Sequence, residues 1–216
     1  MKNPGFTLAE TLITIGIIGV VSAMTIPTLI TKYQKSQVET RLKRFYSMIN
    51  QTVRLSAAEN DDADGWVTLN GEYSYNKNLE WLKQYIYPYM KHINYKQCYN
   101  GGNYNAVCTT LFDGSVMIFK IDTNGAFIKL FLDGNIENLK ERNYFFFQFN
   151  SAKTVGGKIS NSINFVEPTT LDWDGTSVET LKNDSKYGYR HSSDSCRFCT
   201  KIIQLNNWKI PDDYPW

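Results

Sequence analysis

The sequence predicts an α+β fold, in which one long N-terminal helix packs on an antiparallel sheet of about four strands. An uncharged apolar run opens the chain and is followed by apolar residues at helical spacing. Farther on, Asp-Gly and Asn-Gly pairs separate short runs of alternating apolar residues, which is typical of hairpins. About 160 of the 216 residues lie beyond the helix, enough for one domain with its own core.

The first element is a helix long enough to cross a membrane. Thr11 to Thr31 contains no charged residue over 21 positions, which at 1.5 Å per residue is roughly 32 Å, against a bilayer core of about 30 Å. Pro27 lies inside this run, and we expect a kink there rather than an end, because neighbouring helices can compensate a membrane-buried proline. We therefore expect a transmembrane stem over residues 6–31.

An amphipathic continuation follows over residues 32–58. Apolar residues recur in steps of four, three, four and four, at Val38, Leu42, Phe45, Ile49 and Val53. Charged residues lie elsewhere around the helix, so this stripe should pack on the globular head, residues 59–216. The polar segment 60–65 should end the helix near Ala58.

Within the head, Asn78 is the expected N-cap of a short helix that ends near Pro88. The tight turns Asp113-Gly114 and 122–125 separate strands of a meander. Residues 150–186 resemble loops, and a last helix is expected from Cys196 to about Asn206. The expected strands are Val107–Phe112, Ser115–Ile121, Ala126–Leu132 and Tyr144–Phe149.

All four cysteines follow the stem. A basic leader on the inner side would place them on the oxidising side of the membrane, where disulfides form. Of the three possible pairings we favour Cys98 with Cys108, which closes a short loop, and Cys196 with Cys199. Crossed pairing, which would tie the C-terminal segment to the middle of the chain, stays open.

The Cys-Arg-Phe-Cys segment has the spacing of a thiol oxidoreductase, but no buried strand precedes it, as redox folds require. We expect structural disulfides, no catalytic residue, no enzyme activity and no cofactor. Zinc is disfavoured by the cysteine spacing.

Weak calcium ligands are Asp122, Asn124, Asp133 and Asn135, which are also ordinary turn residues.

Glu10 lies at the start of the apolar stem, where an unpaired carboxylate is costly. It stands four residues after Phe6, which directly follows Gly5. This segment, with the short leader 1–5 and the apolar helix, resembles the prepilin signal of type IV pilins and type II secretion pseudopilins. The resemblance covers residues 1 to about 35. A secretory signal cut after Val21-Ser22-Ala23 and a plain membrane anchor are the alternatives.

The resemblance implies a pilin-like fold and a function. A prepilin peptidase would cut between Gly5 and Phe6, the Phe6 amine would be N-methylated, and Glu10 would serve filament assembly. Implied partners are that peptidase and methyltransferase, other pilin or pseudopilin subunits, the inner-membrane assembly platform and membrane lipid. The protein would be a single-pass protein of the bacterial cytoplasmic membrane before assembly, and part of a periplasmic or cell-surface filament afterwards.

The head leaves a second hypothesis open, a minor pilin that acts as a tip adhesin or as a module binding DNA or a secreted substrate. The formal net charge is +2, which disfavours a nucleic-acid-coating surface without excluding nucleic acid as a ligand. The sequence does not separate a pilus from a secretion pseudopilus, or a major subunit from a minor one.

Overall fold

In the computed structural model, the described residues form two compact units, one up to Glu39 and one from Thr40 on, which are treated separately below. Helix α1 (Leu8–Glu59) contributes to both units. The described residues are 5, 7–60, 63, 66, 73–100, 103–122, 125–136, 144–149, 165–170, 173, 175, 177–190 and 196–215.

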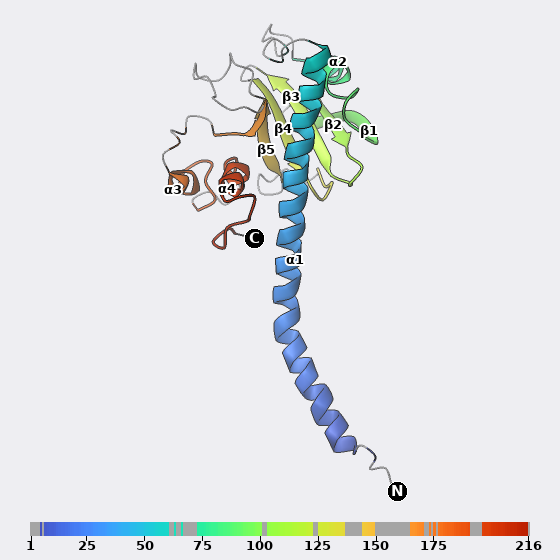
Figure 1. Cartoon of the computed structure of the whole chain (residues 1–216), viewed down its shortest axis with the longest axis vertical. Helices are drawn as coiled ribbons and strands as arrows, with labels where there is room; N and C mark the ends of the chain where they lie inside the picture. Colours follow the sequence, from blue (N-terminus) through green and yellow to red (C-terminus); the bar gives the residue numbers. More distant parts are fainter. Residues whose placement is uncertain are drawn as a thin grey trace. The chain divides into compact units, whose positions relative to one another are not determined.

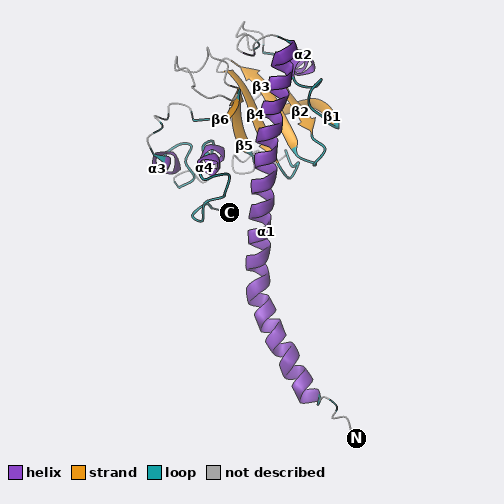
Figure 2. Cartoon of the chain, in the orientation of Figure 1, coloured by secondary structure: helices purple, strands orange, loops and turns teal. Residues whose placement is uncertain are grey.

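The helices of the second unit after α1 are α2 (Tyr75–Tyr85), α3 (Val178–Lys182) and α4 (Cys199–Leu205). Its strands are β1 (Asn94–Asn100), β2 (Asn103–Thr110), β3 (Val116–Asp122), β4 (Gly125–Phe131), β5 (Phe145–Phe149) and β6 (Val166–Pro168). In this unit, α1 and α2 cover the sheet, and α3 and α4 lie to one side of it (Figures 1 and 2).

The sheet is a six-stranded antiparallel meander in chain order. The α+β class is confirmed, and the four predicted strands correspond to β2, β3, β4 and β5. The estimate of about four strands was too low, because both edge strands lack an apolar signal. β1 is a polar strand, exposed from Asn94 to Gln97, and β6 has only three residues.

The long first helix is confirmed, since α1 continues through Pro27 and ends at Glu59. The predicted role of Asn78 is wrong, because the N-cap of α2 is Ser74, whose side chain accepts from the Lys77 N–H. Asn78 is buried instead. Its side-chain amide donates to the Asn105 carbonyl and accepts from the Ile121 N–H, which ties α2 to the sheet.

The last helix begins at Cys199, three residues later than predicted, and no side chain caps it. The short helix α3 was not predicted at all. It lies in a stretch rich in polar residues, and a cap from Ser177 to the Glu179 N–H begins it. Five residues are too few to show a helical apolar repeat, so only its cap signal was readable.

One face of the sheet packs against the second half of α1 and against α2, as Figure 1 shows. Of the predicted stripe, Val38 is only partly buried, and the other four residues are fully buried: Leu42, Phe45, Ile49 and Val53. The Phe45 ring lies 5.3 Å from that of Phe147 on β5. Aromatic pairs of this kind add to the free energy gained from apolar burial. The stripe therefore provides the core between helix and sheet.

The opposite face carries a second core. Strand residues one position out of phase with the first face form it, as period-two alternation requires. The C-terminal segment reaches this face at Arg197, whose guanidinium carbon lies 5.5 Å from the centroid of the Phe146 ring, and the Thr200 hydroxyl accepts from the Phe146 N–H. The cluster comprises Cys98, Ala106, Cys108, Val116, Ile118, Phe131, Tyr144 and Phe146.

A buried amide fixes the short edge strand β6 to α1. The Asn50 side chain donates to the Val166 carbonyl and accepts from the Val166 N–H, both at 2.9 Å. Asn50 is only 4% exposed, so these bonds satisfy backbone groups that water reaches poorly. Beside it, the Tyr46 hydroxyl donates to Glu167 at 2.5 Å. One polar residue in an apolar stripe thus satisfies the outer backbone groups of β6 at Val166.

We expect Asn50→Ala to lower the free energy of unfolding by about 2 kcal/mol, because it leaves two buried backbone groups of Val166 without partners. Gln51→Ala is the matched control, since Gln51 is the exposed next residue. Chemical denaturation of the detergent-solubilised chain, followed by tryptophan fluorescence, measures both. Equal effects of the two substitutions would show that the Asn50 bonds add nothing.

Candidate functional site

The candidate site is the start of the stem, where the Glu10 carboxylate accepts hydrogen bonds from the first residue of its own helix terminus, Thr7. The Glu10 Oε2 atom accepts from the Thr7 N–H and from the Thr7 hydroxyl, each at 2.8 Å. In return, the Thr7 hydroxyl oxygen accepts from the Glu10 N–H at 3.3 Å. Gly5 precedes this arrangement, and Phe6 lies outside the described residues.

This reciprocal pair is a capping box, and it was missed at the sequence level. Thr7-Leu8-Ala9-Glu10 has the Thr-x-x-Glu spacing that predicts it. The box occupies one carboxylate oxygen of Glu10, whereas Oε1 makes no hydrogen bond to the described part of the chain. The box would also survive a cut between Gly5 and Phe6, since the Thr7 N–H belongs to the peptide bond that remains.

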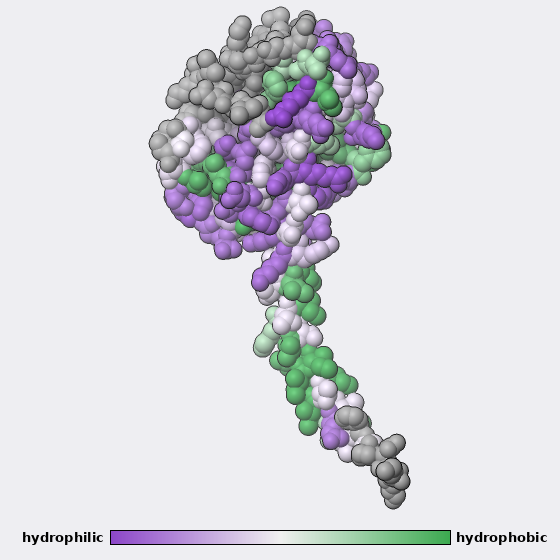
Figure 3. Space-filling model, viewed as in Figure 1, coloured by the Kyte–Doolittle hydropathy of each residue, from purple (hydrophilic) through white to green (hydrophobic). Residues whose placement is uncertain are grey.

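The stem that follows is apolar and exposed on all sides. Its 18-residue apolar window is entirely unburied, and by length and composition α1 is able to cross a membrane. Figure 3 shows apolar side chains along this part of the helix. Large side chains at least half exposed occur at Leu8, Leu12, Ile13, Ile15, Ile17, Ile18, Val20, Val21, Met24, Ile26, Leu29 and Ile30.

Four threonine hydroxyls within the stem find their hydrogen-bond acceptor in the stem itself. The hydroxyls of Thr11, Thr14, Thr25 and Thr31 each donate to the backbone carbonyl four residues earlier. Such back-bonding is what a hydrocarbon environment requires of a hydroxyl. Pro27 stays within the helix, although its missing N–H leaves the Ala23 carbonyl without a helical donor.

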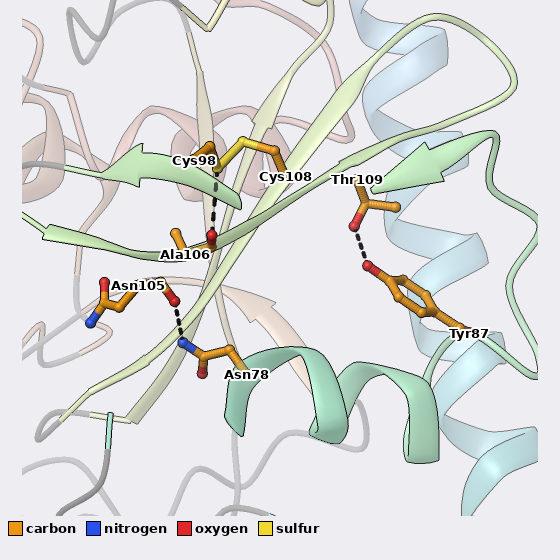
Figure 4. The surroundings of a disulfide bond; sticks show 7 residues. All are labelled: Asn78, Tyr87, Cys98, Asn105, Ala106, Cys108 and Thr109. Carbon is orange, nitrogen blue, oxygen red and sulfur yellow. Dashed lines mark hydrogen bonds between the residues drawn. A yellow bond between two sulfur atoms is a disulfide. The ribbon is translucent and has the colours of Figure 1, made fainter. Parts of the chain in front are cut away.

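The first disulfide joins Cys98 on β1 to Cys108 on β2, with Cα atoms 5.8 Å apart. Figure 4 shows it on one face of the strand pair, while Asn105 and Thr109 of β2 meet Asn78 and Tyr87 on the other. It holds the polar edge strand β1 to the sheet. This is the pairing that loop length favours over the crossed one.

The second disulfide joins Cys196 to Cys199 at the start of α4. It lies in a cluster with Leu181, Tyr189 and Ile202, and both cysteines are at most 3% exposed. A reactive cysteine pair must be open to an attacking thiolate. Burial of this pair supports the structural interpretation of the Cys-Arg-Phe-Cys segment.

The weak calcium ligands do not come together. Asp122 lies at one end of the β3–β4 hairpin, where it pairs with Gly125 and its carboxylate meets Lys120 at 3.2 Å. Asp133 follows the opposite end, and its side chain accepts from the Asn135 N–H. Six residues of strand separate the ends by about 20 Å. Asn124 lies outside the described residues.

No group of three His, Cys, Asp or Glu side chains that could hold a metal ion occurs in the part of the chain the structure describes. His92 lies against the Tyr87 ring, with centroids 4.2 Å apart. Burial raises the pKa of Tyr87 to about 12, although the hydrogen bond with Thr109 acts to lower this pKa. This aromatic pair has a packing role.

Comparison with known proteins gives one family. The sequence model of a family described as a family of unknown function (DUF6613) matches residues 28–216. The match begins after Glu10 and most of the apolar stem, and it covers the whole head. No curated protein and no solved structure matches the chain.

We expect all four cysteines to resist reduction and alkylation while the chain is folded, because each is at most 6% exposed. Incubation with dithiothreitol and iodoacetamide, followed by mass spectrometry, should show modification only after denaturant is added. Rapid native modification of Cys196 and Cys199 would contradict the structural interpretation and favour a redox-active pair.

Proposed function

The chain belongs to the DUF6613 family, and because that family has no assigned function, we propose one from the chain's own residues. It is a structural subunit of a type IV pilus or a type II secretion pseudopilus. A prepilin peptidase cuts it between Gly5 and Phe6, and the stem then assembles it into a filament. The proposal rests on the resemblance of residues 1 to about 35.

The observation that carries the proposal is an unburied apolar stem with one carboxylate at its start. Lipid alone would cover the Leu, Ile and Val side chains, so a plain anchor accounts for the apolar part. Neither lipid nor the capping box gives a partner to Oε1 of Glu10, and an ionised group beside an apolar run is costly. An assembly role gives this carboxylate a partner.

Charge pairing supplies the physical mechanism. Cleavage after Gly5 would make the Phe6 amine a cation beside the apolar stem, where neither it nor Glu10 is easily left unpaired. The capping box uses Oε2 of Glu10 and leaves Oε1 open to a donor. When stems pack with a stagger, Oε1 can accept from the amine of a neighbouring stem. Such a pair fixes the axial register between subunits.

The same reasoning assigns places and partners to two stages. Before assembly, the stem crosses the cytoplasmic membrane and meets the prepilin peptidase and methyltransferase. After assembly, neighbouring stems replace lipid around the exposed Leu and Ile side chains, and the subunit is part of a periplasmic or surface filament. Self-satisfied threonine hydroxyls suit both environments, because they need no outside partner.

We expect Glu10→Gln to reduce the fraction of the chain recovered in sheared or periplasmic filaments by about threefold to tenfold, the range expected for one polar contact between membrane helices. Glutamine keeps the side-chain length and an acceptor for the cap, and removes the charge. Quantitative immunoblotting of the filament and membrane fractions measures the change.

Glu80→Gln is the control, since Glu80 is a carboxylate on α2 whose one ion pair with the described residues is to Lys77 on its own helix. It should leave recovery unchanged. Normal filament recovery of Glu10→Gln would remove the assembly role from this carboxylate, and equal losses from both variants would show a general effect of charge.

A further inference from the structure

The second unit contains a cavity of about 310 Å³ that the proposed assembly role does not use. It lies between one turn of α1 at Arg44–Met48, the segment Tyr89–Lys91 that follows α2, and the turn between β2 and β3. Its size is near the lower end of the range for pockets that bind small organic ligands.

The walls of the cavity are apolar. Phe45, Met90 and Leu111 are each at most 4% exposed and form the floor. Met48 is half-buried, and Phe112 is 69% exposed at the turn. Methionine side chains adapt to ligands of irregular shape. Covering an exposed phenylalanine ring with an apolar group lowers the free energy of the system. The cavity therefore suits a compact apolar body.

Two of the polar side chains in the lining are already engaged. The Tyr89 hydroxyl donates to Glu59 at 2.6 Å and accepts from Asn60. Asp113 accepts from Ser115 through Oδ1 and from Arg41 through Oδ2. Burial opposes ionisation of Asp113, but the bonds from Ser115 and Arg41 outweigh it and lower its pKa. Asp113 is therefore an anion with both oxygens occupied.

The remaining polar lining residues are two cations, Arg44 and Lys91. Both are exposed, and neither makes an ion pair or hydrogen bond with any residue that the structure describes. Arg41, one turn before Arg44, instead binds Asp113. The cavity thus presents two free positive charges beside an apolar floor, without a free acceptor or carboxylate to match a cationic ligand.

We propose that this cavity binds a small amphipathic monoanion, a carboxylic acid with a compact aromatic or branched aliphatic body. The apolar body fills the space between Phe45, Met48 and Leu111, and the carboxylate lies between Arg44 and Lys91. A guanidinium binds a carboxylate through two parallel hydrogen bonds, and an ammonium adds a point charge. The site is independent of Glu10 and of the stem.

The test uses the full chain in lipid nanodiscs and fluorine NMR of para-fluorophenylbutanoate, with empty nanodiscs as the baseline. The neutral probe is para-fluorophenylbutanol, which has the same apolar body. We expect saturable binding of the acid, and binding of the alcohol weaker by about tenfold, because the alcohol lacks the charge that both cations recognise.

Two variants locate the site. Arg44→Gln combined with Lys91→Gln changes only exposed side chains, so the fold should persist and binding of the acid should weaken by about tenfold. Met48→Trp should fill the cavity and abolish binding. Lys43→Gln is the control, because Lys43 is an exposed cation that neighbours Arg44 and does not line the cavity.

Saturable acid binding that the double variant weakens and the Lys43→Gln control preserves supports the proposal. No binding above empty nanodiscs would overturn it, as would equal binding of acid and alcohol. A double variant that binds like the unmodified chain would assign the probe to another place. Equal losses in the double variant and in Lys43→Gln would reduce the effect to general electrostatic attraction.

Discussion

An apolar helix surface must be covered, and the two parts of α1 meet this constraint differently. From Leu8 to Ile30, large apolar side chains remain at least half exposed, so lipid or other helices have to cover them. From Thr40 on, the same helix is one-sided, and Leu42 and Val53 are completely buried. A single helix thus combines a surface that requires an external partner with one whose partner is its own sheet.

The head is organised around that one-sided stretch of α1. Phe45 packs on β5, Asn50 satisfies the backbone of β6, and Arg41 binds the β2–β3 turn through Asp113. The helix therefore contacts the edge strand β6, its neighbour β5 and the β2–β3 turn. At the opposite edge, the mostly exposed strand β1 is held by its ladder with β2 and by the disulfide from Cys98 to Cys108.

Sequence patterns predicted the features that depend on local repeats. The steps from Leu42 to Val53 gave the buried face of α1, and the Asp-Gly turn at Asp113 gave the β2–β3 hairpin. The edge strand β1 escaped prediction because its exposed residues are polar, and β6 because a long-range contact specifies it. β6 is too short to show alternation, and its backbone partner Asn50 lies 116 residues away in the chain. Asn78 resembled a cap but is a buried connector between α2 and two strands.

The stem site shows a different reason for a partial prediction. The Thr-x-x-Glu spacing predicts a capping box. Because Glu10 lies beside an apolar run, however, we expected its partner in another subunit and not in its own helix. The capping box shows that the carboxylate has a local role as well. The two roles are compatible, because the box leaves Oε1 available.

Mass spectrometry of the N-terminal peptide from the chain purified out of its native cells tests the account most directly. The account predicts that the peptide begins at Phe6 and carries one methyl group on its amine. A peptide that begins at Met24 would identify an ordinary secretory signal, and an intact Met1 would identify a plain anchor. Either result would contradict the proposed processing and the assembly role built on it.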